Sequence, residues 1–176
     1  MKGSKIKIKI SSIELSKVNP RFTTIHSTDV NLIDVIKSGN DNYVEENVIK
    51  ELLQREGDFK NFVDLLSSIS LMGFDTKIES LYVVKKEEKI IVAEGNRRIL
   101  ALKLLNGLVQ LPVLDDIMSH TDYDENVTSD DYNLPTALIK RTRSNYKKIE
   151  EIIKDFPEDK KKEKIEVKVV QENTVL

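Results

Sequence analysis

The chain starts with alternating polar and apolar positions, which predicts a strand with one face in water and the other in the core. Over residues 5–10, every odd position is lysine and every even position is isoleucine. Ile13 and Leu15, which lie two residues apart, are taken as an extension of this strand. Pro20 ends it, because proline cannot donate a ladder hydrogen bond.

Three segments with apolar residues at helical spacing follow, and each predicts a helix. The first covers about residues 28–39 and the second about residues 44–57, with a glycine at each end point. The third begins at Asp58, a favourable cap, and ends at Gly73, which suits a left-handed terminator. The stripe that this third helix is expected to bury consists of Phe59, Phe62, Val63, Leu66, Ile69 and Met72.

Two short apolar runs, "SLYVV" and "KIIVA", flank the polar "KKEE" and predict a hairpin over about residues 81–93. The second strand leads directly into "EGNRR". A leucine-rich helix is predicted to follow over about residues 96–107, and its closing glycine suits a helix end.

Residues 111–162 are interpreted as an insertion. Its first part, about residues 115–132, is acidic and rich in Asn, Ser and Thr, which predicts irregular structure. A helix is then expected from a cap at Ser144 to Pro157. Alternating residues predict a last strand over residues 164–170.

This order of elements predicts an α+β fold, with a small mixed sheet flanked by helices and a helical insertion before the last strand. We expect one domain over residues 1–176, with a core formed by residues 5–107 and the strand at 164–170. The tail at 171–176 resembles no domain ending, which leaves open that the chain is a fragment of a longer protein.

Composition narrows the chemistry. The 28 Lys and Arg residues face 30 Asp and Glu residues, so the net charge is −2 and any anion site must be local. The absence of cysteine excludes disulfides, thiolate metal sites and cysteine nucleophiles. His26 and His120 lack a metal-binding spacing, so no metal centre is predicted. No segment resembles a signal peptide or a membrane span, so we expect a cytoplasmic protein with no membrane partner.

The junction "EGNRR" carries the candidate chemistry. A helix that begins at Asn96 directly after a strand exposes first-turn N–H groups at the positive end of its dipole, which suits a phosphate. Gly95 is expected to let a ligand approach the backbone closely. Arg97 and Arg98 are disfavoured there by the dipole unless an anion is bound.

Adjacent residues of a helix point about 100° apart, so one of these arginines is expected to reach the anion and the other to pair with a carboxylate. Glu94 is a candidate for that carboxylate, or for a ligand of a phosphate-bound Mg²⁺. The alternative is a tight turn with an asparagine cap and two solvated arginines before a core helix.

Four stretches together resemble the N-terminal domain of the ParB and sulfiredoxin-like superfamily: "IELSKVNPR", "LLSSISLMGF", "LYVVKKEEKIIVAEG" and "EGNRRILALKLLNG". The resemblance covers about residues 6–107, and "KIEVKVV" is similar to the family's next strand. It implies that Gly95, Asn96, Arg97 and Arg98 hold the phosphates of a nucleotide, CTP or ATP. It further implies that Asn19 and Arg21 lie near the same pocket.

Departures from the family pattern narrow what the resemblance implies. Sulfiredoxin chemistry is excluded because the chain has no cysteine. The downstream polar motif and the helix-turn-helix of the DNA-partitioning CTPases are also missing. DNA contact, directly or through a further C-terminal region, is therefore left open, as is assembly into a homo-oligomer.

Three functions remain in consideration. The first is a ParB-like nucleotide-binding domain of a DNA-associated protein. The second is an enzyme, either an NTP hydrolase, a nuclease or a phosphotransferase, with Glu94 or Glu14 as the catalytic carboxylate. The third is a protein-interaction module with a vestigial site, which would use an apolar patch at Leu114, Ile117 and Met118.

Overall fold

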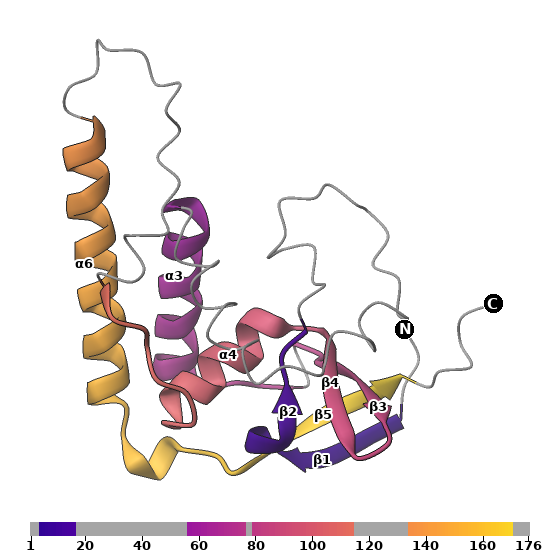
Figure 1. The fold of residues 1–176 in the computed structure, drawn as a ribbon. Helices are drawn as coiled ribbons and strands as arrows, with labels where there is room; N and C mark the ends of the chain where they lie inside the picture. Colours follow the sequence, from indigo (N-terminus) through magenta and orange to yellow (C-terminus); the bar gives the residue numbers. More distant parts are fainter. Residues whose placement is uncertain (1–3, 17–55, 77–78, 115–133, 171–176) are drawn as a thin grey trace.

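A mixed five-stranded sheet organises the part of the chain that the computed structural model describes, namely residues 4–16, 56–76, 79–114 and 134–170 (Figure 1). The strand order is β1-β5-β3-β4-β2, with β1–β5 and β3–β4 antiparallel and β2–β4 and β3–β5 parallel. The predicted α+β class with a small mixed sheet is confirmed. The strands are β1 Ser4–Lys9, β2 Ile13–Glu14, β3 Tyr82–Lys86, β4 Lys89–Glu94 and β5 Lys164–Val170.

The predicted first strand is two strands on opposite edges of the sheet. After β1 the chain turns through the 3-10 helix η1 (Ile10–Ser12), where the Ser12 hydroxyl donates to the carbonyl of Lys9 at 2.8 Å. The expected extension of one strand to Ile13 and Leu15 is therefore wrong. The turn carries Ile10, Ile13 and Leu15 into the core, where each is at most 1% exposed.

Helices α3 (Glu56–Met72), α4 (Asn96–Leu105) and α6 (Leu134–Asp155) follow the predicted order, and a short 3-10 helix, η2 (Glu158–Lys160), precedes β5. The predicted helices over 28–39 and 44–57 lie outside the described residues, except for the last two positions. Those two belong to α3, so the predicted break at Gly57 and cap at Asp58 are wrong. A helical glycine costs only about 1 kcal/mol relative to alanine. The burial of Phe59 and Phe62, two and five positions later, outweighs this cost.

Helix α3 buries the stripe that its spacing predicts, with one exception. Met72 is 81% exposed, because the helix ends there and the chain turns away at Gly73. Gly73 has a φ of +79° and donates to the carbonyl of Ile69 at 2.9 Å, so the predicted left-handed terminator is confirmed. The buried residues of the stripe are Phe59, Phe62, Val63, Leu66 and Ile69.

Helix α6 is longer than predicted and packs along α3 (Figure 1). It begins by Leu134, so Ser144 lies inside the helix and is not its cap. The apolar period continues back from Tyr146 through Thr142, a buried polar residue that hides the pattern in the sequence. Ile149 is fully buried in the common core, so this helix of the insertion is an integral part of the fold.

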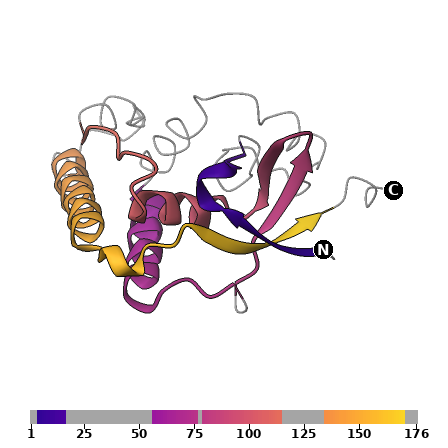
Figure 2. The same ribbon diagram turned by 90° about the horizontal axis from the view of Figure 1, so that it is seen from below.

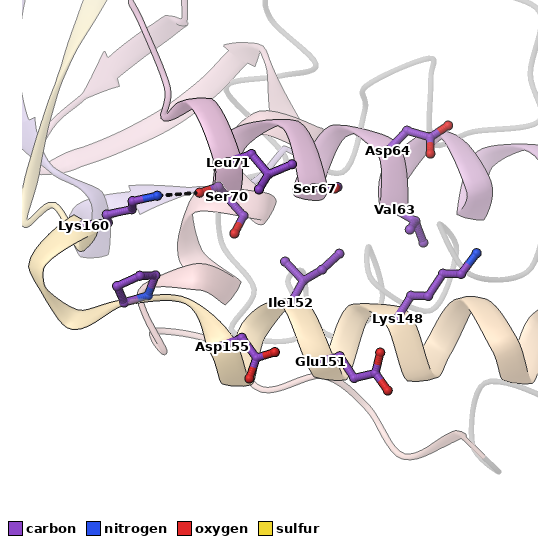
Figure 3. A pocket seen from close by; sticks show the side chains of 11 residues that line it. Val63, Asp64, Ser67, Ser70, Leu71, Lys148, Glu151, Ile152, Asp155 and Lys160 are labelled. Carbon is purple, nitrogen blue, oxygen red and sulfur yellow. Dashed lines mark hydrogen bonds between the residues drawn. The ribbon is translucent and has the colours of Figure 1, made fainter.

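A groove of about 610 Å³ runs between α3 and α6 (Figure 3). Its walls carry serines, carboxylates and lysines, and the Lys160 Nζ donates to the carbonyl of Ser70 at 3.4 Å. A second hollow of about 280 Å³ lies beside it at the end of α3. Among the described residues, none of the site residues expected from the sequence lines either of these two hollows.

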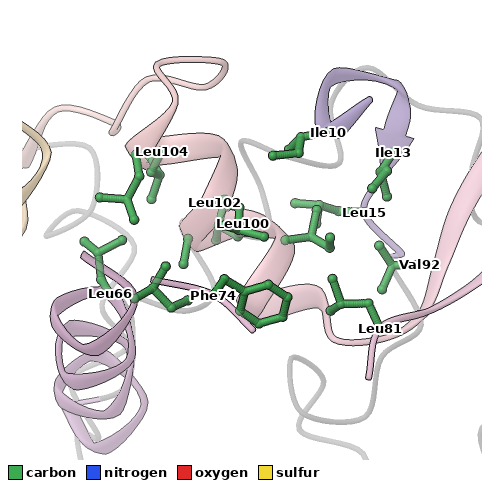
Figure 4. Packing of buried hydrophobic residues seen from close by; sticks show 14 of the residues in the cluster. Ile10, Ile13, Leu15, Leu66, Phe74, Leu81, Val92, Leu100, Leu102 and Leu104 are labelled. Carbon is green, nitrogen blue, oxygen red and sulfur yellow. The ribbon is translucent and has the colours of Figure 1, made fainter. Parts of the chain in front are cut away.

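Helix α4 lies at the centre of the core, and apolar side chains meet it from several elements (Figure 4). Leu100 and Leu104 are at most 1% exposed. The chain leaves α4 through Asn106 and Gly107. Gly107 has a φ of +68°, and its N–H donates a hydrogen bond to the carbonyl of Leu104. Helix α4 contacts α3, α6 and the turn η1, and the view from below shows the same arrangement of helices beside the sheet (Figure 2).

Candidate functional site

Gly95 forms the corner between β4 and α4. Its φ of +109° and ψ of +23° are values that other residues adopt only with strain. A Cβ at this position would lie 2.5 Å from the Leu81 Cδ2. The backbone turn and the packing therefore both require glycine here. The space beside the Gly95 Cα, which we expected to admit a ligand, is occupied by the Leu81 side chain.

The first turn of α4 begins immediately after this corner. The earliest intrahelical bond joins the N–H of Ile99 to the carbonyl of Gly95 at 3.0 Å. The N–H groups before it have no acceptor within a helix, and Gly95 has no side chain with which to cap them. This end of α4 therefore carries the partial positive charge that the sequence predicts.

Asn96 joins the start of α4 to the end of β2. Its Nδ2 donates to the carbonyl of Ser16 at 2.7 Å, and its Oδ1 accepts from the N–H of Ser16 at 3.0 Å. The side chain is 1% exposed, and the bonds connect positions 80 residues apart. We therefore assign the Asn96 amide a structural role, and its side chain is not part of the anion site. It is the first residue of the helix and not its cap.

Arg98 is held by the loop that precedes β3. Its Nε lies 2.7 Å from the Glu79 Oε2, and its Nη1 donates to the carbonyl of Ser80 at 3.5 Å. The expectation that one arginine pairs with a carboxylate is confirmed, but the partner is Glu79 and not Glu94. Glu79 belongs to an irregular loop, where no periodic pattern marks it in the sequence.

Arg97 precedes Arg98 in the same turn, at a position about 100° away around the helix, and is half-buried, with its Nε shielded from solvent. It remains the arginine that we associate with an anion. Asn19 and Arg21, the other two expected phosphate ligands, lie outside the described residues. Ser16, which Asn96 fixes beside the corner, precedes Asn19 by three positions.

The two candidate catalytic carboxylates lie in different surroundings. Glu94 ends β4 next to Gly95 and is exposed. Glu14 lies on β2, 3.5 Å from the Lys89 Nζ. Within the described ranges, no three His, Cys, Asp or Glu side chains come together in a way that could hold a metal ion.

Lys103 is a titratable residue that the sequence analysis missed. It lies seven positions after Asn96, on the same face of α4, and is 5% exposed. Burial lowers the pKa of Lys103 from 10.5 to about 8, and the carboxylate of Glu14 opposes this shift. Its position inside the leucine run "LALKLL" is the signal that could have indicated a buried amine.

Only one residue of the apolar patch that was considered for a protein-interaction module lies within the described residues. Leu114 is half-buried, whereas Ile117 and Met118 lie outside the described residues. None of the helices in the described part of the chain is both long and apolar enough to cross a membrane.

No family model, curated protein or solved structure matches this chain. The geometry described above defines an α+β domain with a mixed sheet and a glycine corner between β4 and α4, followed by two arginines in the first turn of α4.

Proposed function

We propose that this chain is a ParB-like nucleotide-binding domain of a DNA-associated protein and that it holds nucleotide phosphates at the Gly95–Arg98 corner. The observation that carries the proposal is the joint position of two arginines in the first turn of α4, with Arg98 oriented by Glu79. The sequence resemblance to the superfamily points to the same residues.

The electrostatics of the corner support an anion. A cation in the first turn of a helix is disfavoured by about 0.3–1 kcal/mol, so stability alone does not select two arginines there. Glu79 offsets the charge of Arg98, and the exposed Glu94 precedes the corner, so the attraction for an anion would come from Arg97 and the positive end of α4. A phosphate bound to the first-turn N–H groups and to Arg97 would turn the unfavourable interaction between the arginine and the helix dipole into a favourable one.

The experiment is a calorimetric titration of the whole chain with ATP, CTP, GTP and ADP, with and without Mg²⁺. We expect at least one nucleotide to bind and the double variant R97A/R98A to weaken that binding at least tenfold, or about 1.4 kcal/mol. The double variant R141A/R143A, which removes two exposed arginines of α6, is the matched control and should leave the affinity unchanged. Absence of binding, or equal affinity of the double variant, contradicts the proposal.

An enzyme is the second candidate, because the exposed carboxylate of Glu94 directly precedes the corner. It would serve as the base, or as a ligand of a phosphate-bound Mg²⁺, in an NTP hydrolase, a nuclease or a phosphotransferase. Turnover that requires Mg²⁺ and that Glu94→Gln abolishes without loss of nucleotide affinity supports this function. Binding without turnover of nucleotide or DNA leaves the domain as a binding module.

A further inference from the structure

The registers of β1 and β5 place five lysines on one face of the sheet. Lys5 lies opposite Lys168, and Lys9 lies opposite Lys164. Lys7 lies between them, opposite a glutamate. Because side chains alternate along a strand, all five share a face, which we call the lysine face: Lys5, Lys7, Lys9, Lys164 and Lys168.

The other face of the same two strands points into the protein. Ile165 and Val167 are at most 4% exposed and belong to the core cluster, against which Ile6 and Ile8 pack. On the lysine face, by contrast, every lysine of β1 is exposed, as is Lys164. The lysine face is therefore a solvent-facing surface of the sheet, along strands that lie side by side (Figure 2).

The charge of this surface is opposite to that of the whole chain. Five lysines are accompanied by Glu166 on the same face and by Glu163 just before β5, so the local charge is 5 − 2 = +3, whereas the whole chain carries −2. Two ion pairs are present, Lys5–Glu166 at 2.9 Å and Lys9–Glu163 at 3.0 Å. All four side chains are at least 42% exposed, and such pairs contribute only about 0–1 kcal/mol, so a polyanion can displace them.

Protection of a sheet edge explains only part of this pattern. Lysines on an edge strand such as β1 discourage pairing with other chains. Lys164 and Lys168, however, lie on β5, which is an inner strand between β1 and β3. Like charges directly across a ladder destabilise it, and two of the three cross-strand pairs on this face are lysine–lysine pairs. Stability alone therefore does not account for them.

We propose that the lysine face binds the phosphate backbone of a nucleic acid. Alternate residues of a strand are about 7 Å apart and neighbouring strands about 5 Å apart, so the lysines form a compact array of positive charge. The Lys168 Nζ lies 5.3 Å from the centre of the Tyr82 ring, which holds one end of the array in place.

The chemistry of the face favours a polynucleotide over a membrane. Stable adsorption to a lipid surface needs apolar side chains that insert, and the exposed positions here are lysine and glutamate. This face carries no Arg, Asn or Gln, and its flexible lysines bind phosphate as point charges without a fixed geometry. Binding is therefore insensitive to base sequence and strongly dependent on salt.

This inference gives the DNA association in the proposed function a surface and rests on it to that extent. The two nevertheless fail separately. Loss of Arg97 and Arg98 tests mononucleotide binding, whereas loss of lysines from β1 and β5 tests polynucleotide binding. If the protein binds DNA but no mononucleotide, only the proposed nucleotide binding is overturned.

The experiment measures fluorescence anisotropy of labelled single-stranded and duplex DNA of about 20 nucleotides with the whole chain, over a range of salt concentrations. Lys7→Gln and Lys164→Gln are combined, because neither lysine has an ion-pair partner among the described residues. The matched control combines Lys147→Gln and Lys154→Gln, which removes the same charge from exposed positions of α6. The double variant K7R/K164R tests rescue.

We expect the wild-type chain to bind and the K7Q/K164Q variant to bind about a hundredfold more weakly to duplex at about 50 mM salt, which is about tenfold for each lysine. The slope of log K against log salt should fall in magnitude by about 1.8, or 0.9 for each contact. The control and the K7R/K164R variant should bind as the wild type does. No binding by the wild type, an equal loss in the control, or binding to phosphatidylserine vesicles but not to DNA overturns the inference.

Discussion

Substitution of Asn96 tests whether the bond between α4 and β2 holds the candidate site together. Asn96→Ala removes both partners of the Ser16 backbone, one donor and one acceptor, at a position that is 1% exposed. An unsatisfied buried polar group costs about 1–3 kcal/mol, so for the two bonds we expect a loss of about 2–6 kcal/mol in the free energy of unfolding. This is a large share of the 5–15 kcal/mol that is typical of a domain.

Asn96→Asp separates the two bonds. A carboxylate accepts from the N–H of Ser16 but repels its carbonyl oxygen, whereas the protonated acid can donate to that oxygen as the amide does. The pKa of the new carboxyl group is therefore expected to lie above its unfolded value of about 3.9. Since the charged form is disfavoured only in the folded state, the loss of stability should appear as the pH rises above about 4.

Urea denaturation at about pH 4 and pH 8 measures both effects, with Asn61→Ala on the exposed side of α3 as the control. The control should change the free energy of unfolding by less than about 0.5 kcal/mol. Asn96→Asp should approach Asn96→Ala at pH 8 and the wild type at pH 4. Stability of Asn96→Ala within about 0.5 kcal/mol of the wild type would refute a structural role for this amide.

Two further substitutions probe the surroundings of the corner. Gly95→Ala should lower the free energy of unfolding by about 2–5 kcal/mol, because strain from the positive φ adds to a clash with Leu81. Gly73→Ala, which has open space around its Cβ, should lower it by only about 1–2 kcal/mol. Equal losses in urea denaturation would refute the close contact with Leu81. Burial lowers the pKa of Lys103 to about 8, so between pH 8 and 10.5 this lysine holds its proton in the unfolded chain but not in the folded one. The free energy of unfolding of the wild type should therefore rise by roughly 3 kcal/mol over this range. Lys103→Met should lack this rise in denaturation curves across the same pH range, and an identical profile would contradict it.

Local signals in the sequence predict those elements whose causes are local. The end of α3 at Gly73 and the β3–β4 hairpin follow from residue type and spacing alone. The early start of α6 was missed because the apolar period of this helix passes through the polar residue Thr142. Periodicity also missed the transfer of residues 13–14 to the opposite sheet edge, since both strands alternate in the same way and only pairing separates them.

The candidate site shows the same division. The corner at Gly95 and the separate directions of the two arginines follow from backbone geometry near one position. The partners of these residues do not, because Glu79 and Ser16 reach the corner only through the tertiary fold. The amide of Asn96 illustrates the consequence: its type suits a phosphate ligand, but long-range pairing gives it a different role.

Amide chemical shifts test the central claim most directly, because they report on the first turn of α4 itself. A ¹⁵N-labelled chain is titrated with the nucleotide that binds most tightly, in the presence of Mg²⁺. The account predicts that the largest shift changes occur at the N–H groups of Gly95, Asn96, Arg97 and Arg98, and that Arg97→Ala reduces them. Saturable binding with shift changes confined to other parts of the chain, or no shift change at any of these four amides, would contradict it.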